Sequence, residues 1–375
     1  MLAFGGSCND GTHLADPHPA ELFDPEARTV ETVDQELAGD VFYAGSYNTH
    51  YTFPFSLREF PTARLDLTSR TWTDYGLPNE REREEGASVL LPLRPADGYR
   101  ARVLLAGGGT PTGRTAVADA EVIDLDADRP RWRSVEPMAH ARYYTYAVLL
   151  PDGTVFVMGG RSGTGGHGDG APDGGEDDAT DGGGTAGVDA AADPATGEVP
   201  PSPGAVHETE LFDPATGSWT TLAPMTVDRL YHSGALLLPD GRVMTSGSNP
   251  ARRVDELRIE TYRPPYLFAG PRPAVEDAPD RVRPGEPFAI GVDDADGVDE
   301  VTLVRQSSTT HCLNTDQRLV ELPIVGRDVR SGTVRVRLPA NPSLVPPGYY
   351  LLFVLRDGVP SRAPFVHVPR PDLSG

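Results

Sequence analysis

Lysine is absent from this chain, so all 33 of its basic residues are arginine. We interpret this as compositional bias from a GC-rich coding sequence or from salt adaptation, and it says little about chemistry. Acidic residues outnumber basic ones, and the net charge is −22. Such a charge argues against nucleic acid and against anionic membranes as partners.

Long apolar runs are also missing. No window approaches the 18 continuous apolar residues that a transmembrane helix needs, so no membrane span is predicted. The N-terminus lacks a basic region followed by an apolar stretch, and no signal peptide is visible. However, residues 1–6 read like the middle of a repeat. We therefore expect the natural start to lie upstream, with N-terminal propeller blades missing.

Cysteine is scarce. The chain has 2 cysteines, Cys8 and Cys312, and they fall in different predicted domains. Two cysteines cannot build a disulfide framework, and nothing in the sequence supports a bond between them.

Glycine and proline are abundant, with 41 and 37 residues, which favours many turns over long helices. A short apolar run ending in glycine recurs at residues 2–6, 41–45, 103–108, 155–160 and 243–247. A second motif lies between these runs, at 20–25, 63–67, 120–124 and 210–214, and Trp72, Trp132 and Trp219 follow it. Each unit thus contains short strands joined by turns.

The repeat spacing of roughly 50 residues is close to that of kelch repeats. We therefore predict an all-β chain, with a kelch-type β-propeller over residues 1–270. An ordinary β-sandwich is the alternative, but it does not explain the repeat. Residues 161–205 interrupt a blade and are rich in glycine and aspartate. This insertion predicts a disordered loop; calcium binding by its aspartates is the less ordinary alternative.

The propeller signals stop near residue 270, where Pro271 and Pro273 mark a linker. Residues 271–375 predict an Ig-like β-sandwich, because alternating apolar and polar residues recur in short runs. We expect its strands at 287–292, 300–305, 318–324, 333–338, 349–355 and 363–368.

Three residues share one register in successive repeats. Runs of apolar residues end in proline at Pro92, Pro151 and Pro239. Counting back seven positions from each proline gives Glu85, Tyr144 and His232, with Tyr231 beside the histidine. Residues at one register of a repeat protein point to one place. A carboxylate, two phenols and an imidazole there predict a metal site; alternatively, Tyr231 and His232 plug the propeller mouth through backbone hydrogen bonds.

Residues 229–243, with the run Arg-Leu-Tyr-His-Ser, resemble the copper-ligand blade of galactose oxidase and glyoxal oxidase. Pro264-Pro265-Tyr266 looks like the exit from that propeller. Residues 309–318 resemble the segment by which the C-terminal early-set domain sends a histidine back to the axis. Residues 346–354 are also typical of that domain.

The resemblance implies one copper ion (Cu²⁺) held by two tyrosines and two histidines. Carried over by position, the metal ligands are Tyr144, Tyr231, His232 and His311. Tyr144 matches the radical tyrosine and Tyr231 the axial tyrosine, and both are the catalytic candidates. The spacing agrees, since eight positions separate Tyr144 from Asp152 and His232 from Asp240. His50 and His140 lie off this register, and we interpret both as loop residues.

One position departs from the family. Glu85 stands where the family has a cysteine cross-linked to the radical tyrosine, so no Cys–Tyr cross-link is expected. We expect Glu85 to be a surface charge; a fifth ligand or a general base are the alternatives. A stacking tryptophan is also absent after Gly160, where Arg161 follows.

Together these features predict a secreted, monomeric copper oxidase that converts a primary alcohol or aldehyde with O₂ and releases H₂O₂. Turnover is expected to be weak or absent without the sulfur, because the modified tyrosine supplies one of the two electrons. The alternative is a non-catalytic propeller that binds a carbohydrate or a protein. A third reading is a copy of the family decayed by truncation.

Overall fold

The computed structural model describes residues 2–3, 18–24, 27–37, 63–66, 71–75, 83, 85–110, 115–164, 202–249, 255–310 and 313–370. The chain is almost entirely β. Within these residues the helical segments are two 3₁₀ turns, η1 (Pro95–Asp97) and η2 (Pro265–Phe268). In the described part of the chain, no helix is long and apolar enough to cross a membrane. The predicted all-β class is confirmed.

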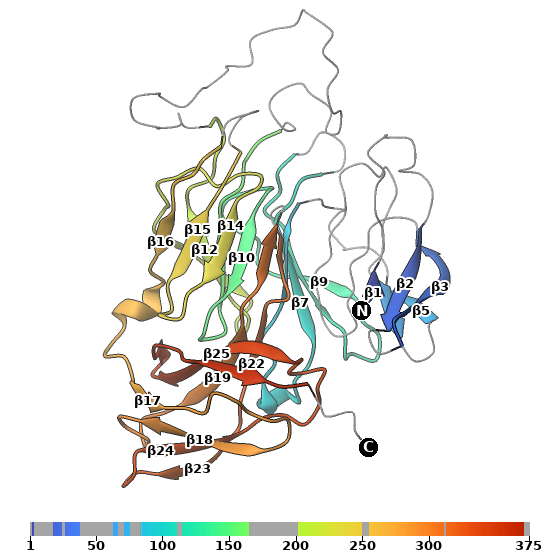
Figure 1. Ribbon diagram of the computed structural model, residues 1–375. Helices are drawn as coiled ribbons and strands as arrows, with labels where there is room; N and C mark the ends of the chain where they lie inside the picture. The colour runs from blue at the N-terminus through green and yellow to red at the C-terminus, as the bar shows by residue number, and fades with distance from the viewer. Residues whose placement is uncertain are drawn as a thin grey trace, which may run out of the picture.

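Three antiparallel sheets follow one another in the chain at the positions of the predicted blades, and they are here named blades A, B and C (Figure 1). Blade A contains β6 (Ala87–Leu90), β7 (Arg102–Ala106), β8 (Ala120–Asp124) and β9 (Trp132–Ser134). Blade B contains β10 (Tyr146–Leu149), β11 (Val155–Met158), β12 (Thr209–Asp213) and β13 (Ser218–Leu222). Blade C contains β14 (Gly234–Leu237), β15 (Val243–Ser246) and β16 (Glu260–Tyr262).

Two smaller sheets precede the blades. The first pairs β1 (Leu2–Ala3), β2 (His18–Asp24) and β3 (Thr29–Leu37), and the second pairs β4 (Ala63–Asp66) with β5 (Thr71–Asp74). They fall on the predicted repeat motifs at residues 2–6, 20–25 and 63–67. The run at 41–45 and the insertion from 165 to 200 lie outside the described residues.

The glycines that end the apolar runs let neighbouring blades approach closely. Gly107 has φ +64°, and a Cβ on it would lie 2.8 Å from the backbone oxygen of Arg142 in blade B. Gly159 repeats this one blade later, with φ +66° and 2.6 Å to the oxygen of Arg229. Any side chain there would clash with backbone, which explains why glycine recurs at this point of the repeat.

The glutamate of the second motif neutralises a buried arginine. Arg83 pairs with Glu121 at 2.5 Å, and Arg142 pairs with Glu210 at 2.5 Å, with all four side chains 0% exposed. Burial lowers the pKa of Arg142, and the carboxylate of Glu210 opposes that shift. The pairs join the start of the innermost strand to the third strand of the same blade, so they fix the blade entry.

The C-terminal unit is a sandwich of two sheets. One sheet orders β17 (Val275–Asp277), β18 (Pro287–Val292), β24 (Thr333–Arg337) and β23 (Ile324–Asp328). The other contains β22 (Arg318–Glu321), β19 (Glu300–Arg305), β25 (Gly348–Arg356), β26 (Val359–Pro360) and β27 (Phe365–Val368). Both inner faces share one buried apolar cluster. The predicted bounds of β18 and β19 agree with the structure.

The sandwich binds the three blades at the prolines that end their innermost strands. The amide of Leu93, next to Pro92, donates to Leu319 O at 3.0 Å. The Thr302 hydroxyl donates to Pro151 O at 3.2 Å, and the amide of Ala363 donates to Pro239 O at 2.8 Å. The opposite ends of β6, β10 and β14 therefore point away from the sandwich.

A hairpin from the sandwich rises between these strands. It consists of β20 (Ser308–Thr310) and β21 (Leu313–Thr315). In Figure 1 it is the brown pair of strands beside β7 and β10. β21 contacts β6, β10 and β14, and β20 contacts β14. The hairpin thus occupies the axis that the innermost strands surround.

Candidate functional site

The three residues of the shared register have the same unusual backbone conformation. Glu85, Tyr144 and His232 have φ of 57°, 60° and 59°, in the left-handed region. This conformation costs about 1–2 kcal/mol for a residue with a Cβ, so three equal occurrences indicate one repeated turn. Each stands two residues before an innermost strand, β6, β10 or β14. The predicted equivalence of their positions is confirmed.

The turns bring aromatic side chains from two blades together. The ring centroids of Tyr144 and Tyr231 are 5.3 Å apart, and those of Tyr231 and His232 are 3.8 Å apart. Tyr144 is 3% exposed, whereas His232 is exposed to solvent. The cluster therefore runs from a buried phenol to an accessible imidazole at the open ends of the innermost strands.

A further tyrosine packs against this cluster. The ring of Tyr143 lies 4.7 Å from that of Tyr144 and is fully buried. The sequence predicts no stacking ring after Gly160, and the role of Tyr143 as a neighbour of Tyr144 was not predicted. The signal was present, since Tyr143-Tyr144 and Tyr231-His232 are equivalent pairs in successive blades. Tyr143 thus gives Tyr144 an aromatic contact that the absent tryptophan does not supply.

Glu85 corrects an expectation. It was expected to be a surface charge, but it is 7% exposed and therefore buried. Its carbonyl oxygen accepts a hydrogen bond from the Tyr144 amide at 3.0 Å. Glu85 is therefore a buried residue at the contact between the turns that precede blades A and B.

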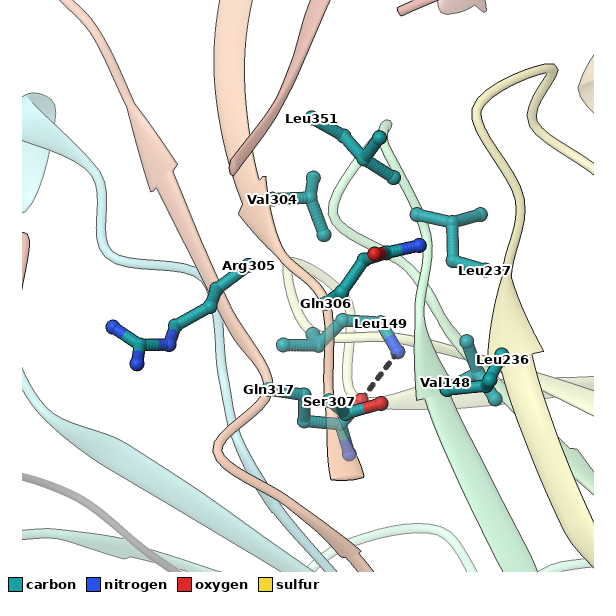
Figure 2. A pocket seen from close by; sticks show the side chains of 10 residues that line it. All are labelled: Val148, Leu149, Leu236, Leu237, Val304, Arg305, Gln306, Ser307, Gln317 and Leu351. Atoms are coloured by element: carbon teal, nitrogen blue, oxygen red, sulfur yellow. Dashed lines mark hydrogen bonds between the residues drawn. The ribbon is translucent and has the colours of Figure 1, made fainter. Parts of the chain in front are cut away.

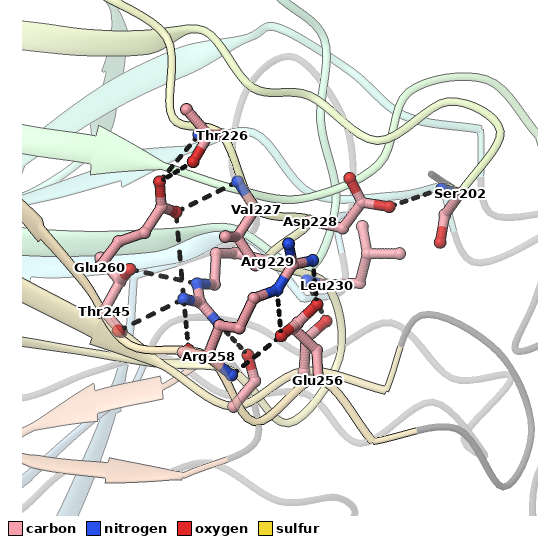
Figure 3. A network of polar contacts seen from close by, with 12 residues as sticks. Ser202, Thr226, Val227, Asp228, Arg229, Leu230, Thr245, Glu256, Arg258 and Glu260 are labelled. Atoms are coloured by element: carbon pink, nitrogen blue, oxygen red, sulfur yellow. Dashed lines mark hydrogen bonds and ion pairs between the residues drawn. The ribbon is translucent and has the colours of Figure 1, made fainter. Parts of the chain in front are cut away.

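Arg229 holds the segment that carries Tyr231 and His232 (Figure 3). Its side chain is 1% exposed and donates to Gly247 O at 2.7 Å and Arg258 O at 2.7 Å. It also donates to the Thr245 hydroxyl at 3.1 Å. Burial lowers the pKa of Arg229. These bonds join the segment before β14 to β15 and to the connection that leads into β16, so they hold the segment of the two ligand candidates in place.

Asn249 touches both candidates of blade C. Its backbone N–H donates to the backbone oxygen of Tyr231 at 2.7 Å. Its side-chain Oδ1 lies 2.5 Å from Nδ1 of His232. Its Nδ2 donates to Asp255 Oδ1 at 2.7 Å. The His232 imidazole contacts a side chain, whereas the structural alternative predicted that backbone hydrogen bonds alone would hold it.

The inner end of the axis is closed by the sandwich. Gln317 accepts from the Leu149 amide at 3.0 Å and donates to Ala147 O at 3.1 Å. Asn314 Nδ2 donates to the same oxygen at 3.0 Å. A small pocket between the strands, shown in Figure 2, is lined by Val148, Leu149, Leu236, Leu237, Val304, Arg305, Gln306, Ser307, Gln317 and Leu351. The mostly apolar lining makes this pocket a packing gap of the domain contact.

The other histidines considered from the sequence lie in loops or outside the described residues. His311 and Cys312 stand between β20 and β21 in the sequence. Both lie outside the described residues, and so does His50. His140 stands in a bend before Arg142, as expected for a loop residue. Among the described residues, no group of three or more His, Cys, Asp or Glu side chains could hold a metal. Phenol oxygens also bind metals, so the chemistry of the tyrosine-rich set decides whether it fits a metal.

The described donor set suits copper. Two phenol oxygens and one imidazole nitrogen are ligands that Cu(II) accepts, and the exposed His232 leaves access for a further ligand. The Nδ1 atom of His232 lies 2.5 Å from Asn249 Oδ1, so a metal would have to be bound through Nε2. The described residues therefore fit a mononuclear copper site, with no acidic cluster that would favour calcium.

Comparison with known proteins confirms the predicted resemblance to galactose oxidase-like proteins. Residues 272–368 match the family Galactose oxidase-like, Early set domain. The chain is similar to the protein named Aldehyde oxidase GLOX of Vitis pseudoreticulata, with 32% identity over 76% of this chain and 53% of that protein. It is also 26% identical to a Galactose oxidase of Gibberella zeae, over 71% of this chain and 36% of that protein.

A solved structure has the same architecture. A fungal alcohol oxidase of the AA5 family, in complex with copper, superposes with a TM-score of 0.69 and 25% identity. The match covers 95% of this chain and 71% of that chain. The chain spans about half the length of the curated aldehyde oxidases that it matches, at 53% and 47%.

Proposed function

We propose that this chain carries the copper-binding core of an oxidase that converts a small primary alcohol or aldehyde with O₂ into the oxidised product and H₂O₂. The observation that supports it is the meeting of Tyr144, Tyr231 and His232 from two blades. The relatives named as aldehyde and galactose oxidases and the copper-bound fungal alcohol oxidase support the same assignment.

Tyr144, Tyr231 and His232 would hold the metal, and His311 would complete the set from the hairpin. When bound, copper supplies a one-electron redox centre that the side chains alone lack. His232 is exposed, so a small substrate can reach the cluster from solvent. Tyr231, which the resemblance matches to the axial tyrosine, would take the proton of a substrate hydroxyl. Tyr144 is shielded by Tyr143, which protects its ring from water.

The experiment has two stages. The purified chain is loaded with Cu²⁺, freed of excess metal and analysed for copper content, and then assayed for peroxide on sugars, small alcohols and aldehydes. We expect about one copper per chain and peroxide from at least one substrate class. His232→Ala should abolish both, whereas His140→Ala, in a loop outside the cluster, should retain both. A chain that binds no copper, or loaded protein that yields no peroxide, contradicts the oxidase.

One observation favours a second function. A buried carboxylate at Glu85 replaces the sulfur that tunes the tyrosine in the family. The site can then bind copper yet turn over weakly, and the propeller face can serve as a carbohydrate- or protein-binding module. Glycan or protein binding that survives chelation and His232→Ala favours this function. Secretion and a monomeric state remain predictions. Secretion is to be checked on the natural gene product, and the monomeric state by light scattering.

A further inference from the structure

The side chain of Asn249 lies between His232 and Asp255. The Asn249 Oδ1 atom is 2.5 Å from His232 Nδ1, and the Asn249 Nδ2 atom is 2.7 Å from Asp255 Oδ1. Asn249 follows β15, and Asp255 stands farther along the same connection to β16. Two consecutive hydrogen bonds thus connect Asp255, through Asn249, to His232 of the proposed copper site.

The carboxylate decides which way the asparagine amide faces. An ionised carboxylate only accepts hydrogen bonds, so the group that faces Asp255 must be the amide NH₂. The oxygen of the amide therefore faces His232. An amide oxygen only accepts, so Nδ1 of His232 must carry the hydrogen in this contact.

We infer that Asn249 is a positioning residue that holds His232 in the tautomer with hydrogen on Nδ1 and the lone pair on Nε2, and that Asp255 fixes the orientation of the Asn249 amide. This inference rests on the proposed function where it concerns metal, since only Nε2 can then act as a ligand. The backbone N–H of Asn249 also donates to the backbone oxygen of Tyr231 at 2.7 Å, so one residue orders both ligand candidates of blade C.

The neighbouring blade explains why asparagine stands here. In blade B the equivalent residue is Arg161, whose amide donates to Tyr143 O at 2.8 Å, as Asn249 does to Tyr231. The backbone contact is therefore common to both blades. Arginine has no acceptor atom and could not receive the Nδ1–H of an imidazole. Blade B carries a tyrosine, Tyr144, at the register where blade C carries histidine, and needs no such acceptor.

The tautomer can be measured without metal. The full chain is labelled with ¹⁵N-histidine, and its 9 histidines are observed in long-range ¹H–¹⁵N spectra at about pH 8, above the ordinary imidazole pKa near 6.5. His232→Gln identifies the signal. We expect a protonated Nδ1 and an unprotonated Nε2 in the native chain, and a mixture of tautomers in Asn249→Ala. A native ring with hydrogen on Nε2, or a ring unchanged in Asn249→Ala, overturns the inference.

Two variants control for folding. Asn249→Asp keeps an acceptor beside His232 and should keep the Nδ1–H tautomer. Asn341→Ala removes a loop asparagine of the sandwich and should leave the His232 signal unchanged. If Asn249→Ala does not fold, Asp255→Ala replaces it, because loss of the carboxylate frees the amide to turn. A His232 signal that is unchanged in Asp255→Ala then counts against the role of the carboxylate.

A binding titration with Cu²⁺ alone links the tautomer to the metal. Asn249→Ala should bind Cu²⁺ about 10-fold to 100-fold more weakly than the native chain, as for other partners of metal-bound histidines. Equal affinity of Asn249→Ala and the native chain overturns the positioning role. Should the native chain bind no Cu²⁺, the proposed oxidase fails, while the metal-free spectra still decide the tautomer.

Discussion

The amide of Tyr144 donates a hydrogen bond to the carbonyl oxygen of Glu85 at 3.0 Å, and both residues have a left-handed backbone. Two adjacent blades are thus locked together at the point where the proposed copper site begins. The Glu85 side chain starts from the turn of blade A that is equivalent to the turn of Tyr144 in blade B, and it is buried. The sequence resemblance to galactose oxidase implies that this position corresponds to the cysteine that modifies the radical tyrosine.

Replacing Glu85 with cysteine should restore the modification. After Cu²⁺ loading in air, Glu85→Cys should lose two hydrogen atoms in intact-protein mass spectra, because a thiol and a ring C–H become a C–S bond while O₂ is reduced. Peroxide production should rise by roughly tenfold or more, which corresponds to about 1.4 kcal/mol of barrier. Glu85→Gln removes the charge without adding sulfur and should do neither. An unchanged mass in Glu85→Cys refutes the proposed position of this side chain.

Repetition made much of the fold predictable. The shared register of Glu85, Tyr144 and His232 was visible because each precedes an apolar run that ends in proline. Their equal φ values show that counting along the repeat located one backbone turn three times. In the sandwich, alternation of apolar residues predicted β18 and β19 with their observed bounds, since both strands bury one face.

Contacts between units could not be predicted in the same way. Gln317 reaches the backbone of blade B, 168 residues away in the sequence, and nothing local indicates that pairing. Asn249 contacts His232 only because the β14–β15 hairpin brings the two residues together. The burial of Glu85 was misjudged because neighbouring charges suggested a surface, and the register alone could not decide it, since Tyr144 is buried and His232 is exposed in equivalent turns.

Gln317 should stabilise the contact between blade B and the sandwich. It is 4% exposed and bonds the Leu149 amide at 3.0 Å and Ala147 O at 3.1 Å. Gln317→Ala leaves the buried Leu149 amide without this acceptor, whereas Ala147 O keeps its bond from Asn314 Nδ2 at 3.0 Å. The loss should cost about 1–3 kcal/mol of unfolding free energy. Urea unfolding measures the loss. Gln306→Ala, on the exposed neighbour, should stay within about 0.5 kcal/mol of the native chain; equal losses in both variants contradict the assignment.

The glycine- and aspartate-rich insertion should be removable. Its flanks are tied by the Ser162 amide, which donates to Gly204 O at 2.8 Å, and by a bridge between Arg161 and Ala205. Replacing residues 165–200 with a short glycine–serine turn should leave the melting temperature within about 2 °C, because the tied ends need no long loop. A variant with these residues shuffled controls for length. Unfolding of the shortened chain alone would show that the insertion contributes to the fold.

Tyr266 should make the chain sensitive to alkali. It is 6% exposed, and its hydroxyl donates to Gly241 O at 2.5 Å, which ties the propeller exit to a turn of blade C. Burial, and then the charge of Asp152, raise the pKa of Tyr266 well above its ordinary value. The unfolded chain therefore releases the phenol proton at a lower pH than the folded chain. Stability from the neutral phenol is complete below about pH 10 and is lost as pH rises from there toward the folded-state pKa.

Tyr266→Phe separates the hydrogen bond from the titration. At pH 8 the variant should be about 1 kcal/mol less stable than the native chain, because one buried hydrogen bond is lost. Between about pH 10 and 11 the native chain loses stability through this phenol and the variant does not, so their urea midpoints should converge. Tyr349→Phe, at a site that is 65% exposed, should follow the native chain throughout. Midpoints of Tyr266→Phe that run parallel to the native values up to pH 11 would show that this phenol titrates normally in the folded state.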